Sequence, residues 1–577
     1  MIISSRQPPS QYIRRSHTPL GISPAKHGFK RLFQEPPPSP RLPSLVNQRG
    51  QRPPTNRHWL SMRLLAWLCG VGLILWFAVS RLRLEHRPPP VSFMSHDGQE
   101  YEIVGDSALP DYPTPVVVTD RRGRLRWTIS IPPARQFPLR PDEYSDICQQ
   151  SEEIAHHVAE LKYGAGKGHG HFDYYHLDKN FMDVREAEEN GLLPGMAVMG
   201  KKQGKGIWGS IVGGEGLAGE DFDAKEAGME MCEKSLTYVL ETTDAGLGNT
   251  LLGLWMAYGL AKEEGRAFFI DDTNWVYGDY ETFFQPPPIP SCLPPPRTQI
   301  LPCPHHTAHL LVSAATTYWT FGHNFHEEFE DPRKMEVWRQ HRIFGFMELG
   351  KNELFHLADQ DEAYSEKRKK ELRAKVGGDD GLIVGVHVRH GDRHPFEFQY
   401  QESYIPLDRY ISAAESLTQS NTSHNGNHDH NNNNTLILLA SDDPDVYSAP
   451  EMSPTTRAQS QIHLASKTSL EATTPLPPGA RAPYIDNNIG WEGGFYHDLF
   501  WSLDKHNSAN AGSIRALLAR AYLLDLKVLG ETSDRVVCGV SAVGCRLLAV
   551  IMGWEKAIKE GRWGSVDGDF EWMGILW

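Results

Sequence analysis

Three apolar segments in the C-terminal part of the chain have the composition of strands that are buried on both faces. They are "GLIVGVHVRHGD" (381–392), "TLILLASDDP" (435–444) and the start of "RVVCGVSAVGCRLLAVIMG" (535–553). Strands that helices cover on both sides read as continuous apolar runs, which is typical of parallel sheets. Because ligands bind at the carboxyl ends of such strands, the sequence predicts an open α/β sheet with one crevice shared by the three strand ends.

A second α/β unit begins at Cys232. From there the pattern predicts a strand, the turn "GLGN" (246–249), an amphipathic helix and the apolar strand "RAFFIDD". Glycines at such a turn let backbone N–H groups approach an anion at the start of a helix, although a plain tight turn fits the same residues. The isolated G-x-G-x-x-G pattern at Gly214, Gly216 and Gly219 lies outside any strand–helix unit, so we expect a loop there.

The N-terminal part has the signature of a membrane anchor. Residues 1–63 are rich in Pro, Ser and Arg, with eleven Lys or Arg and a single acid, Glu35. Seventeen uncharged residues follow at 64–80, near the short end of the length that crosses a bilayer. The basic tail predicts a cytoplasmic N-terminus and a lumenal catalytic region, and the short span suits a Golgi membrane. The net charge of −14 argues against a general nucleic-acid binder.

The expected organisation follows from these changes in composition. It comprises a disordered basic tail (1–63), a transmembrane signal anchor (64–80), a stem (81–140), a helical and Gly-rich region (141–231), a first α/β half (232–371) and a second, Rossmann-like half (381–573). Two polar segments of the second half, at 416–434 and 451–482, are expected to be disordered loops.

Cysteine usage agrees with a lumenal location. The six cysteines beyond the predicted span are Cys148, Cys232, Cys292, Cys303, Cys538 and Cys545. Because their number is even, all of these cysteines can form disulfides in an oxidising compartment. Free buried thiols are the alternative. Spacing alone does not give the pairing.

Six motifs, in order along the chain, resemble those of the α1,6-fucosyltransferases that add core fucose to N-glycans, with a looser similarity to protein O-fucosyltransferases. They are "NWVYGDYETFFQP" (274–286), "HVRHGDR" with a following Glu (387–397), "ASDDP" (440–444), "YIDNNIGW" (484–491), "RAYLLDL" (520–526) and "CGVSAVGCR" (538–546). The resemblance covers roughly residues 232–572. It implies a GT-B-like fold, in which two facing open α/β halves enclose a donor cleft. We expect no counterpart of the family's C-terminal SH3-like domain.

The resemblance also implies a function. It points to a type II Golgi glycosyltransferase that transfers fucose from GDP-fucose to a glycan by inverting displacement, with the N-glycan core as acceptor in α1,6 linkage and with no metal or other cofactor. Its partners would be the membrane and a glycoprotein, and a homodimer is left open. A protein O-fucosyltransferase or another sugar-nucleotide transferase would keep the donor site and change the acceptor surface. From a different class, the chain could be a membrane-tethered scaffold with a decayed catalytic fold.

Several residues receive a role from the resemblance together with their chemistry. Arg389, at the end of a strand, suits the cation that stabilises a departing diphosphate, with a surface salt bridge as the alternative. Glu397 aligns with the family's base, or is a loop carboxylate in water, and Arg393 stands where the family has a Lys. A carboxylate accepts both the N1–H and the exocyclic amine of guanine, which suits Asp525. The other donor-binding residues that the resemblance implies are His387, His390, Asp392, Gly246, Gly248, Asn249, Tyr277, Asp442, Asp443, Arg520 and Ser541.

One position departs from the family's pattern. His390 stands where the family has a second Arg, and Gly391 follows where it has Thr. A neutral His stabilises phosphate charge less than Arg does, although a pKa near ~6.5 allows a phosphate to protonate it. We therefore expect an altered donor affinity or rate, and this residue is the feature that favours the scaffold alternative.

The resemblance bears on the disulfides and on metal binding as well. The family has a disulfide at places that match Cys232 and Cys292, and Cys538 with Cys545 would close the short loop that carries Ser541. Cys148 with Cys303 then remains by elimination. Asp442 and Asp443 have metal binding as an alternative role, but the family's chemistry is metal-independent and we assign no metal site.

Overall fold

The computed structural model describes residues 2–5, 92–94, 100–104, 109–163, 174–193, 211–212, 230–241, 246–378, 381–390, 395–401, 403–419, 435–464 and 509–575. The predicted anchor (64–80), the G-x-G-x-x-G pattern and the motif at 484–491 lie outside these residues. Within them, no helix combines the length and the apolar composition that a membrane span requires. The chain divides into two compact units, Ser5–Ile103 and Val104–Trp577 together with Met1–Ser4. The smaller unit contains β2 (Ser92–Met94), which pairs antiparallel with β3 (Glu100–Val104).

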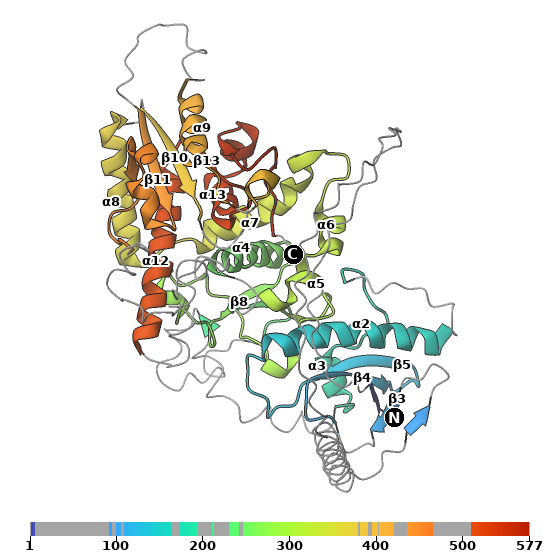
Figure 1. Ribbon diagram of the computed structural model, residues 1–577. Coiled ribbons are helices and arrows are strands. Elements are labelled where there is room, and N and C mark those ends of the chain that lie inside the picture. Colours follow the sequence, from blue (N-terminus) through green and yellow to red (C-terminus); the bar gives the residue numbers. More distant parts are fainter. Residues whose placement is uncertain are drawn as a thin grey trace, which may run out of the picture. The chain divides into compact units, whose positions relative to one another are not determined.

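The C-terminal sheet of the larger unit is parallel and doubly wound (Figure 1). Its order is β12-β11-β10-β13-β14, and each neighbouring pair is parallel. The strands are β10 (Leu382–Val388), β11 (Thr435–Ser441), β12 (Thr455–Arg457), β13 (Arg535–Cys538) and β14 (Trp563–Ser565). The predicted open parallel sheet is thereby confirmed. The direction of winding reverses between β10 and β13, and such a reversal leaves a crevice at the carboxyl edge of the sheet.

Strand β10 presents alternate residues to helices on two faces. Val384, Val386 and Val388 share an apolar cluster with residues of α9 (Leu407–Gln419). Gly385 points to the other face, where a Cβ atom would lie 2.5 Å from the Ser533 hydroxyl, just beyond α12 (Ala509–Thr532). Helix α13 (Val543–Met552) follows β13 and joins the core cluster that contains residues of α12.

The first half contains a second sheet in the order β6-β8-β7-β9. Its strands are β6 (Ile211–Val212), β7 (Ser235–Val239), β8 (Ala267–Asp271) and β9 (His309–Ser313). Strands β7, β8 and β9 are parallel, and β6 is an antiparallel edge. The predicted strand–turn–helix–strand unit is present, because α4 (Leu247–Glu263) connects β7 to β8.

Helix α4 differs from the amphipathic helix that the sequence suggests, because its side chains are buried nearly all round. One side covers the first sheet, and the other packs against α7 (His341–Leu354) at very short range. A Cβ atom on Gly259 would lie 2.3 Å from the Phe346 carbonyl, and one on Gly350 would lie 2.2 Å from the Trp255 carbonyl. Helix α13 contacts both α4 and α7, so the two halves share one continuous hydrophobic core.

An additional layer covers the other face of the first sheet. It consists of β4 (Thr114–Thr119), β5 (Leu125–Ser130) and α2 (Pro141–Tyr163), and β1 (Ile2–Ser5) pairs with β4. Val117 and Trp127 of this layer share an apolar cluster with Val239 and Leu311 of the sheet. The part of the expected stem at 109–140 is thus packed into the larger unit, because its β-prone segments bury almost every side chain of β4.

The remaining α-helices of the described part are α3 (Val184–Glu189), α5 (Thr317–Phe321), α6 (His323–Phe329) and α8 (Asp359–Lys375). Helix α8 packs on α12 of the second half, although its sequence precedes that half. Both segments expected to be disordered loops are partly ordered. Residues 416–419 end α9, and β12 within 451–464 pairs with the edge of β11.

Three disulfides join the six cysteines, in the pairs expected. They are Cys148–Cys303, Cys232–Cys292 and Cys538–Cys545. The first joins α2 of the additional layer to the segment just before β9, and the second joins the start of the first half to the segment after β8. The third closes the turn between β13 and α13, so it fixes the loop that carries Ser541.

Candidate functional site

Two helix N-termini meet at the carboxyl edge of the sheets. Helix α4 begins after Gly246 and α13 begins after Ala542, and neither cap residue has a side chain that bonds the first turn. A Cβ atom on Gly248 would lie 2.8 Å from Val543 Cγ1, which shows how closely the two first turns approach. The first N–H groups of a helix lack partners within it, and they form its positive end. Two such ends side by side favour an anion.

His387 borders this meeting point from the end of β10. A Cβ atom on Gly544, in the first turn of α13, would lie 2.7 Å from His387 Nε2. Burial and the charge of Arg389 lower the pKa of His387 to about 3, so the imidazole is neutral at physiological pH. Its Nδ1 atom is buried and has no hydrogen-bond partner among the described residues. The site therefore offers a neutral polar ring next to the helix ends.

Arg389 follows β10 and lies close enough to His387 to affect its titration. Its Nε is 3.6 Å from Asp442 Oδ2, and its side chain is 14% exposed. Asp442 comes from the end of β11 and also accepts a hydrogen bond from the backbone N–H of His390, at 2.8 Å. The carboxylate thus holds the end of β10 in place and keeps the guanidinium at the carboxyl edge. A mostly buried arginine there is placed to meet an anion in the crevice.

Two side chains hold the ring of His390 in place. Its Nδ1 is 3.0 Å from Asp443 Oδ2, and its ring stacks on Tyr404 with the centroids 4.0 Å apart and the planes 11° apart. Because the Asp443 carboxylate accepts a hydrogen bond from Nδ1–H, Nε2 is left as the nitrogen that can contact a ligand. Nε2 is buried and has no hydrogen-bond partner among the described residues. His390 and Asp443 therefore form a positioned His–Asp pair.

Helix α12 contributes Tyr522 and Asp525, which lie one turn apart on one face. The Tyr522 hydroxyl lies 3.0 Å from the Cβ position of Gly248 and 3.3 Å from that of Gly544. Burial raises the pKa of Asp525 to about 8, against the opposing effect of hydrogen bonds from Gln459. Asp525 Oδ1 has no hydrogen-bond partner in the described part of the chain. A buried carboxyl with an unused oxygen suits a ligand that brings hydrogen-bond donors.

Two other predicted residues lie at the carboxyl edge of the first sheet. Asn249 is in the first turn of α4, and its Oδ1 is buried without a hydrogen-bond partner within the described ranges. Tyr277 is 3% exposed and packs edge-on against Trp275, with the ring centroids 5.3 Å apart. Both belong to the same carboxyl edge as the glycine turn, because they follow β7 and β8.

Arg520 and Glu397 are engaged in ion pairs. Arg520 donates two hydrogen bonds of 2.7 Å to Asp361, so it ties α12 to α8. Glu397 Oε2 accepts a hydrogen bond of 2.6 Å from Arg409 Nη1 on α9, and its Oε1 accepts one from Gln399. The structure brings neither group into direct contact with His387 or Arg389. Gly391, Asp392 and Arg393 lie outside the described residues.

Asp567 is a functional candidate that the sequence reasoning missed. It is completely buried after β14 and accepts hydrogen bonds from the backbone N–H groups of Phe396 (3.1 Å), Glu397 (2.9 Å) and Ser541 (3.4 Å). It therefore ties the loop after β10 to the turn after β13. Its signal in the sequence is only the "SVDGD" that follows a short strand, which does not reveal these partners.

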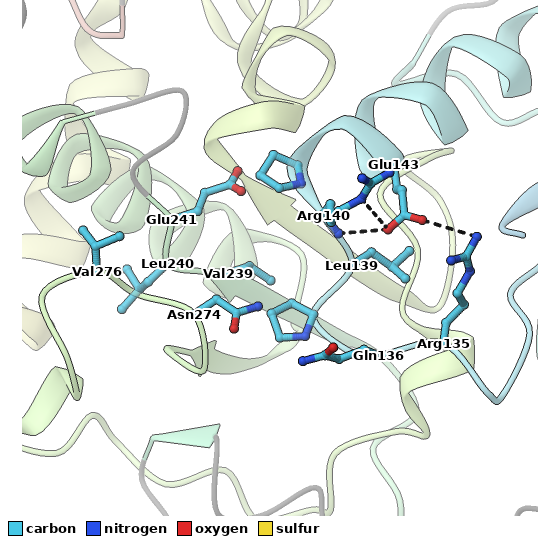
Figure 2. Close-up of a pocket in the computed structure, with 12 residues that line it drawn as sticks. Arg135, Gln136, Leu139, Arg140, Glu143, Val239, Leu240, Glu241, Asn274 and Val276 are labelled. Carbon is cyan, nitrogen blue, oxygen red and sulfur yellow. Dashed lines mark hydrogen bonds and ion pairs between the residues drawn. The ribbon is translucent and has the colours of Figure 1, made fainter. Parts of the chain in front are cut away.

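A hollow of about 340 Å³, whose lining residues are drawn in Figure 2, is another feature that the sequence did not predict. It lies at the carboxyl end of β7, where Glu241 and Leu240 meet the segment that enters α2 and the loop after β8. Its polar lining comes from Arg135, Gln136, Arg140, Glu143, Glu241 and Asn274. Elsewhere, within the described residues, no group of three or more His, Cys, Asp or Glu side chains is arranged to hold a metal ion.

Comparisons with known proteins do not establish a family for this chain. No protein-family model and no curated protein matches the chain. Solved structures of NodZ alpha-1,6-fucosyltransferase align with 55% of this chain. The NodZ structure from a crystal soaked with GDP-fucose has 12% sequence identity to this chain and a TM-score of 0.26, and the match covers 92% of the NodZ chain. The structure co-crystallised with GDP has 14% identity and a TM-score of 0.27, and the match covers 91% of its chain. Fucosyltransferase NodZ from Bradyrhizobium is 11% identical, with a TM-score of 0.26 over 92% of its chain. Such TM-scores are too low to establish a common fold.

Replacing Gly544 by alanine tests the contact between α13 and His387. Alanine is intrinsically more favourable than glycine in a helix by ~1 kcal/mol. This gain is opposed by the contacts of the added Cβ atom, 2.7 Å from the imidazole and 3.3 Å from the Tyr522 hydroxyl. Overpacking of this kind costs ~1–3 kcal/mol. We expect the free energy of unfolding, measured with guanidinium, to fall by ~1 kcal/mol. Gly539→Ala is the control, since its Cβ would meet nothing closer than 3.5 Å. A Gly544→Ala protein as stable as this control would refute the contact.

Proposed function

We propose that the chain is a glycosyltransferase whose donor, a nucleoside-diphosphate sugar, places its diphosphate where the N-termini of α4 and α13 meet. The observation that carries this proposal is the close approach of two helix N-termini beside Arg389 and His387. Backbone N–H groups and a buried arginine are the usual means of holding a diphosphate. The order of motifs that resembles the α1,6-fucosyltransferases further supports GDP-fucose as the donor.

The departure of the diphosphate is the step that these groups assist. As the bond between the sugar and the diphosphate breaks, negative charge grows on the leaving oxygen. Arg389 and the two helix ends are fixed before the reaction, so they stabilise this charge without reorganising. His390, oriented by Asp443, adds a hydrogen bond from Nε2 when that nitrogen is protonated. A scaffold protein without catalytic activity would not need an oriented imidazole here, so the His–Asp pair supports a catalytically active site.

Asp525 would recognise the base of the donor. Guanine presents two adjacent donors, N1–H and its exocyclic amine, and an ionised carboxylate accepts both. The unused Oδ1 of Asp525 is one such acceptor, and the oxygen that Gln459 contacts is the other. Uracil presents a single N–H on the corresponding edge, and adenine presents no N1–H. The carboxylate therefore favours a guanine nucleotide.

Glu397 would act as the base in an inverting displacement. The acceptor hydroxyl attacks the anomeric carbon from the side opposite the diphosphate, and its proton passes to the carboxylate. In this structure, Arg409 pairs with one carboxylate oxygen, and the remaining lone pairs of the carboxylate can accept the acceptor's hydroxyl proton. Asp567 fixes the backbone of Glu397 in either state.

The cellular compartment and the acceptor are part of the same proposal. We place the catalytic region in the Golgi lumen, behind a type II anchor at 64–80, and we name the N-glycan core in α1,6 linkage as the acceptor. The basic tail and the three disulfides support a secretory compartment. A protein hydroxyl as acceptor would leave the donor site unchanged.

Calorimetric titration of the full chain with GDP, UDP and ADP tests the donor assignment. We expect saturable binding of GDP and at least tenfold weaker binding of the other two, because each loses a hydrogen bond to a charged group (~1.5–3 kcal/mol). Release of fucose from GDP-fucose then reports turnover. A folded protein with intact disulfides that binds none of the three nucleotides would overturn the proposed function.

A further inference from the structure

The hollow at the end of β7 has balanced charge. Two arginines, Arg135 and Arg140, and two carboxylates, Glu143 and Glu241, line it. A polyanion or polycation would meet repulsion from one of these pairs. A neutral ligand rich in hydroxyl groups meets donors and acceptors on every side, because guanidinium groups donate and carboxylates accept. The hollow's volume of about 340 Å³ lies at the lower end of the range for small-molecule sites.

The two carboxylates of the hollow are held in position before any ligand binds. Glu143 Oε1 is 3.6 Å from Arg135 Nη2, and Glu143 Oε2 accepts a hydrogen bond from the Arg140 backbone at 3.1 Å, as Figure 2 shows. Glu241 is 7% exposed, and its Oε1 accepts a hydrogen bond from the backbone of Ala315 at 2.8 Å. Such fixed groups reduce the entropy that a ligand loses on binding.

The hollow adjoins the proposed donor site through the chain itself. Glu241 precedes the glycine turn that starts at Gly246, and Val276 of its lining is the neighbour of Tyr277. Both connections lie at the carboxyl edge of the first sheet, where α4 presents its N-terminus. The carbonyl of Glu241 also accepts a hydrogen bond of 3.4 Å from Thr250 Oγ1 in the first turn of α4, so the lining of the hollow contacts that helix end.

We propose that this hollow is an acceptor subsite that binds a neutral sugar unit of the glycan, and this inference rests on the proposed function. The carboxylates of Glu143 and Glu241 accept hydrogen bonds from sugar hydroxyls, and the amides of Asn274 and Gln136 donate to sugar oxygens. Leu139, Leu240 and Val276 supply the apolar wall for the C–H face of the ring. The additional N-terminal layer is thereby part of the substrate-binding surface.

Saturation-transfer NMR and calorimetry on the full chain, with GDP present, test this assignment. The probes are N,N′-diacetylchitobiose and maltose as neutral disaccharides and glucuronic acid as an acidic sugar. Asn274→Ala removes one amide from an exposed position, and Gln136→Trp fills the hollow. Asn352→Ala, an exposed amide on α7, is the matched control. Each variant is also titrated with GDP alone.

We expect at least one neutral disaccharide to bind, with a Kd raised at least fivefold by Asn274→Ala and binding abolished by Gln136→Trp. The Kd for GDP should stay within twofold in both variants, and Asn352→Ala should match the wild type. The inference is overturned if neither disaccharide binds, if both variants bind them normally, or if only glucuronic acid binds. Failure of the wild type to bind GDP would instead refute the proposed function, whatever the sugars do.

Discussion

Replacing Arg389 by alanine is expected to lower kcat for fucosyl transfer by about 10²–10³-fold and to weaken GDP binding. The size of the effect on kcat follows from the loss of one fixed charge partner for a group that becomes more negative in the transition state. The larger share should fall on kcat, because the helix ends still hold the ground-state diphosphate. Initial rates with GDP-fucose, together with calorimetric titration with GDP, separate the two effects.

Two further variants make this result specific. Arg389→Lys restores the charge without the planar pair of donors, so we expect partial recovery of kcat. Arg535→Gln removes an arginine from the amino end of β13, at the opposite edge of the same sheet, and should leave both kcat and GDP affinity unchanged. Wild-type rates in a correctly folded Arg389→Ala protein would show that the interaction with Asp442 at 3.6 Å is only structural.

The parts of the fold that the sequence predicted are those specified by local pattern. Residues 382–388 form a continuous apolar run that fits only a strand covered on both faces, and the structure places it at the centre of the parallel sheet. The glycines at the start of α4 were likewise evident in the sequence, and the structure shows that Gly248 is needed where the helix meets Val543. The amphipathic reading of α4 was wrong, because α7 covers the face that pattern analysis assigns to solvent.

The parts that escaped prediction depend on contacts between distant segments. Arg140 and Glu241 line one hollow although the sequence between them spans several elements. Asp567 joins Glu397 to Ser541 through backbone hydrogen bonds, which leave no pattern in side-chain types. The pairing of Arg409 with Glu397 has the same character, since either residue alone reads as a solvated charge. Site residues that act through the backbone or through a partner on another element are therefore the ones a single sequence conceals.

The affinity for GDP is expected to rise with pH, because Asp525 must lose a proton to accept both guanine donors. Its pKa in the free protein is about 8, so the carboxyl is mainly protonated at neutral pH, and binding releases that proton. The Kd should fall by up to about tenfold per pH unit between about pH 6 and 8 and then level off. Calorimetry in buffers of different ionisation enthalpy measures the released proton directly.

Asp525→Asn should bind GDP about 10²-fold more weakly at pH 8, and its affinity should not change with pH. The amide oxygen of asparagine accepts a hydrogen bond from one guanine donor, but its NH₂ group faces the second donor and cannot accept from it. Asp359→Asn, at an exposed carboxylate on α8, should keep the wild-type profile. A GDP affinity in wild type that does not change with pH, or an unaltered profile in Asp525→Asn, would remove Asp525 from guanine recognition.

The same residue should lower the stability of the protein without ligand. The pKa of about 8 in the folded protein lies above the ordinary value of 3.8, so the group costs no stability below about pH 4, where it is protonated in both the folded and the unfolded state. Between about pH 4 and 8 the free energy of unfolding falls, because the unfolded chain can ionise the carboxyl and the folded protein cannot. Asparagine fills nearly the same volume and never ionises. We therefore expect Asp525→Asn to unfold at a higher temperature than wild type at pH 8 and above, with the difference vanishing near pH 4. Loss of GDP binding combined with a gain in stability would identify a buried carboxyl retained for its ligand, because a residue that served only the fold would show losses in both.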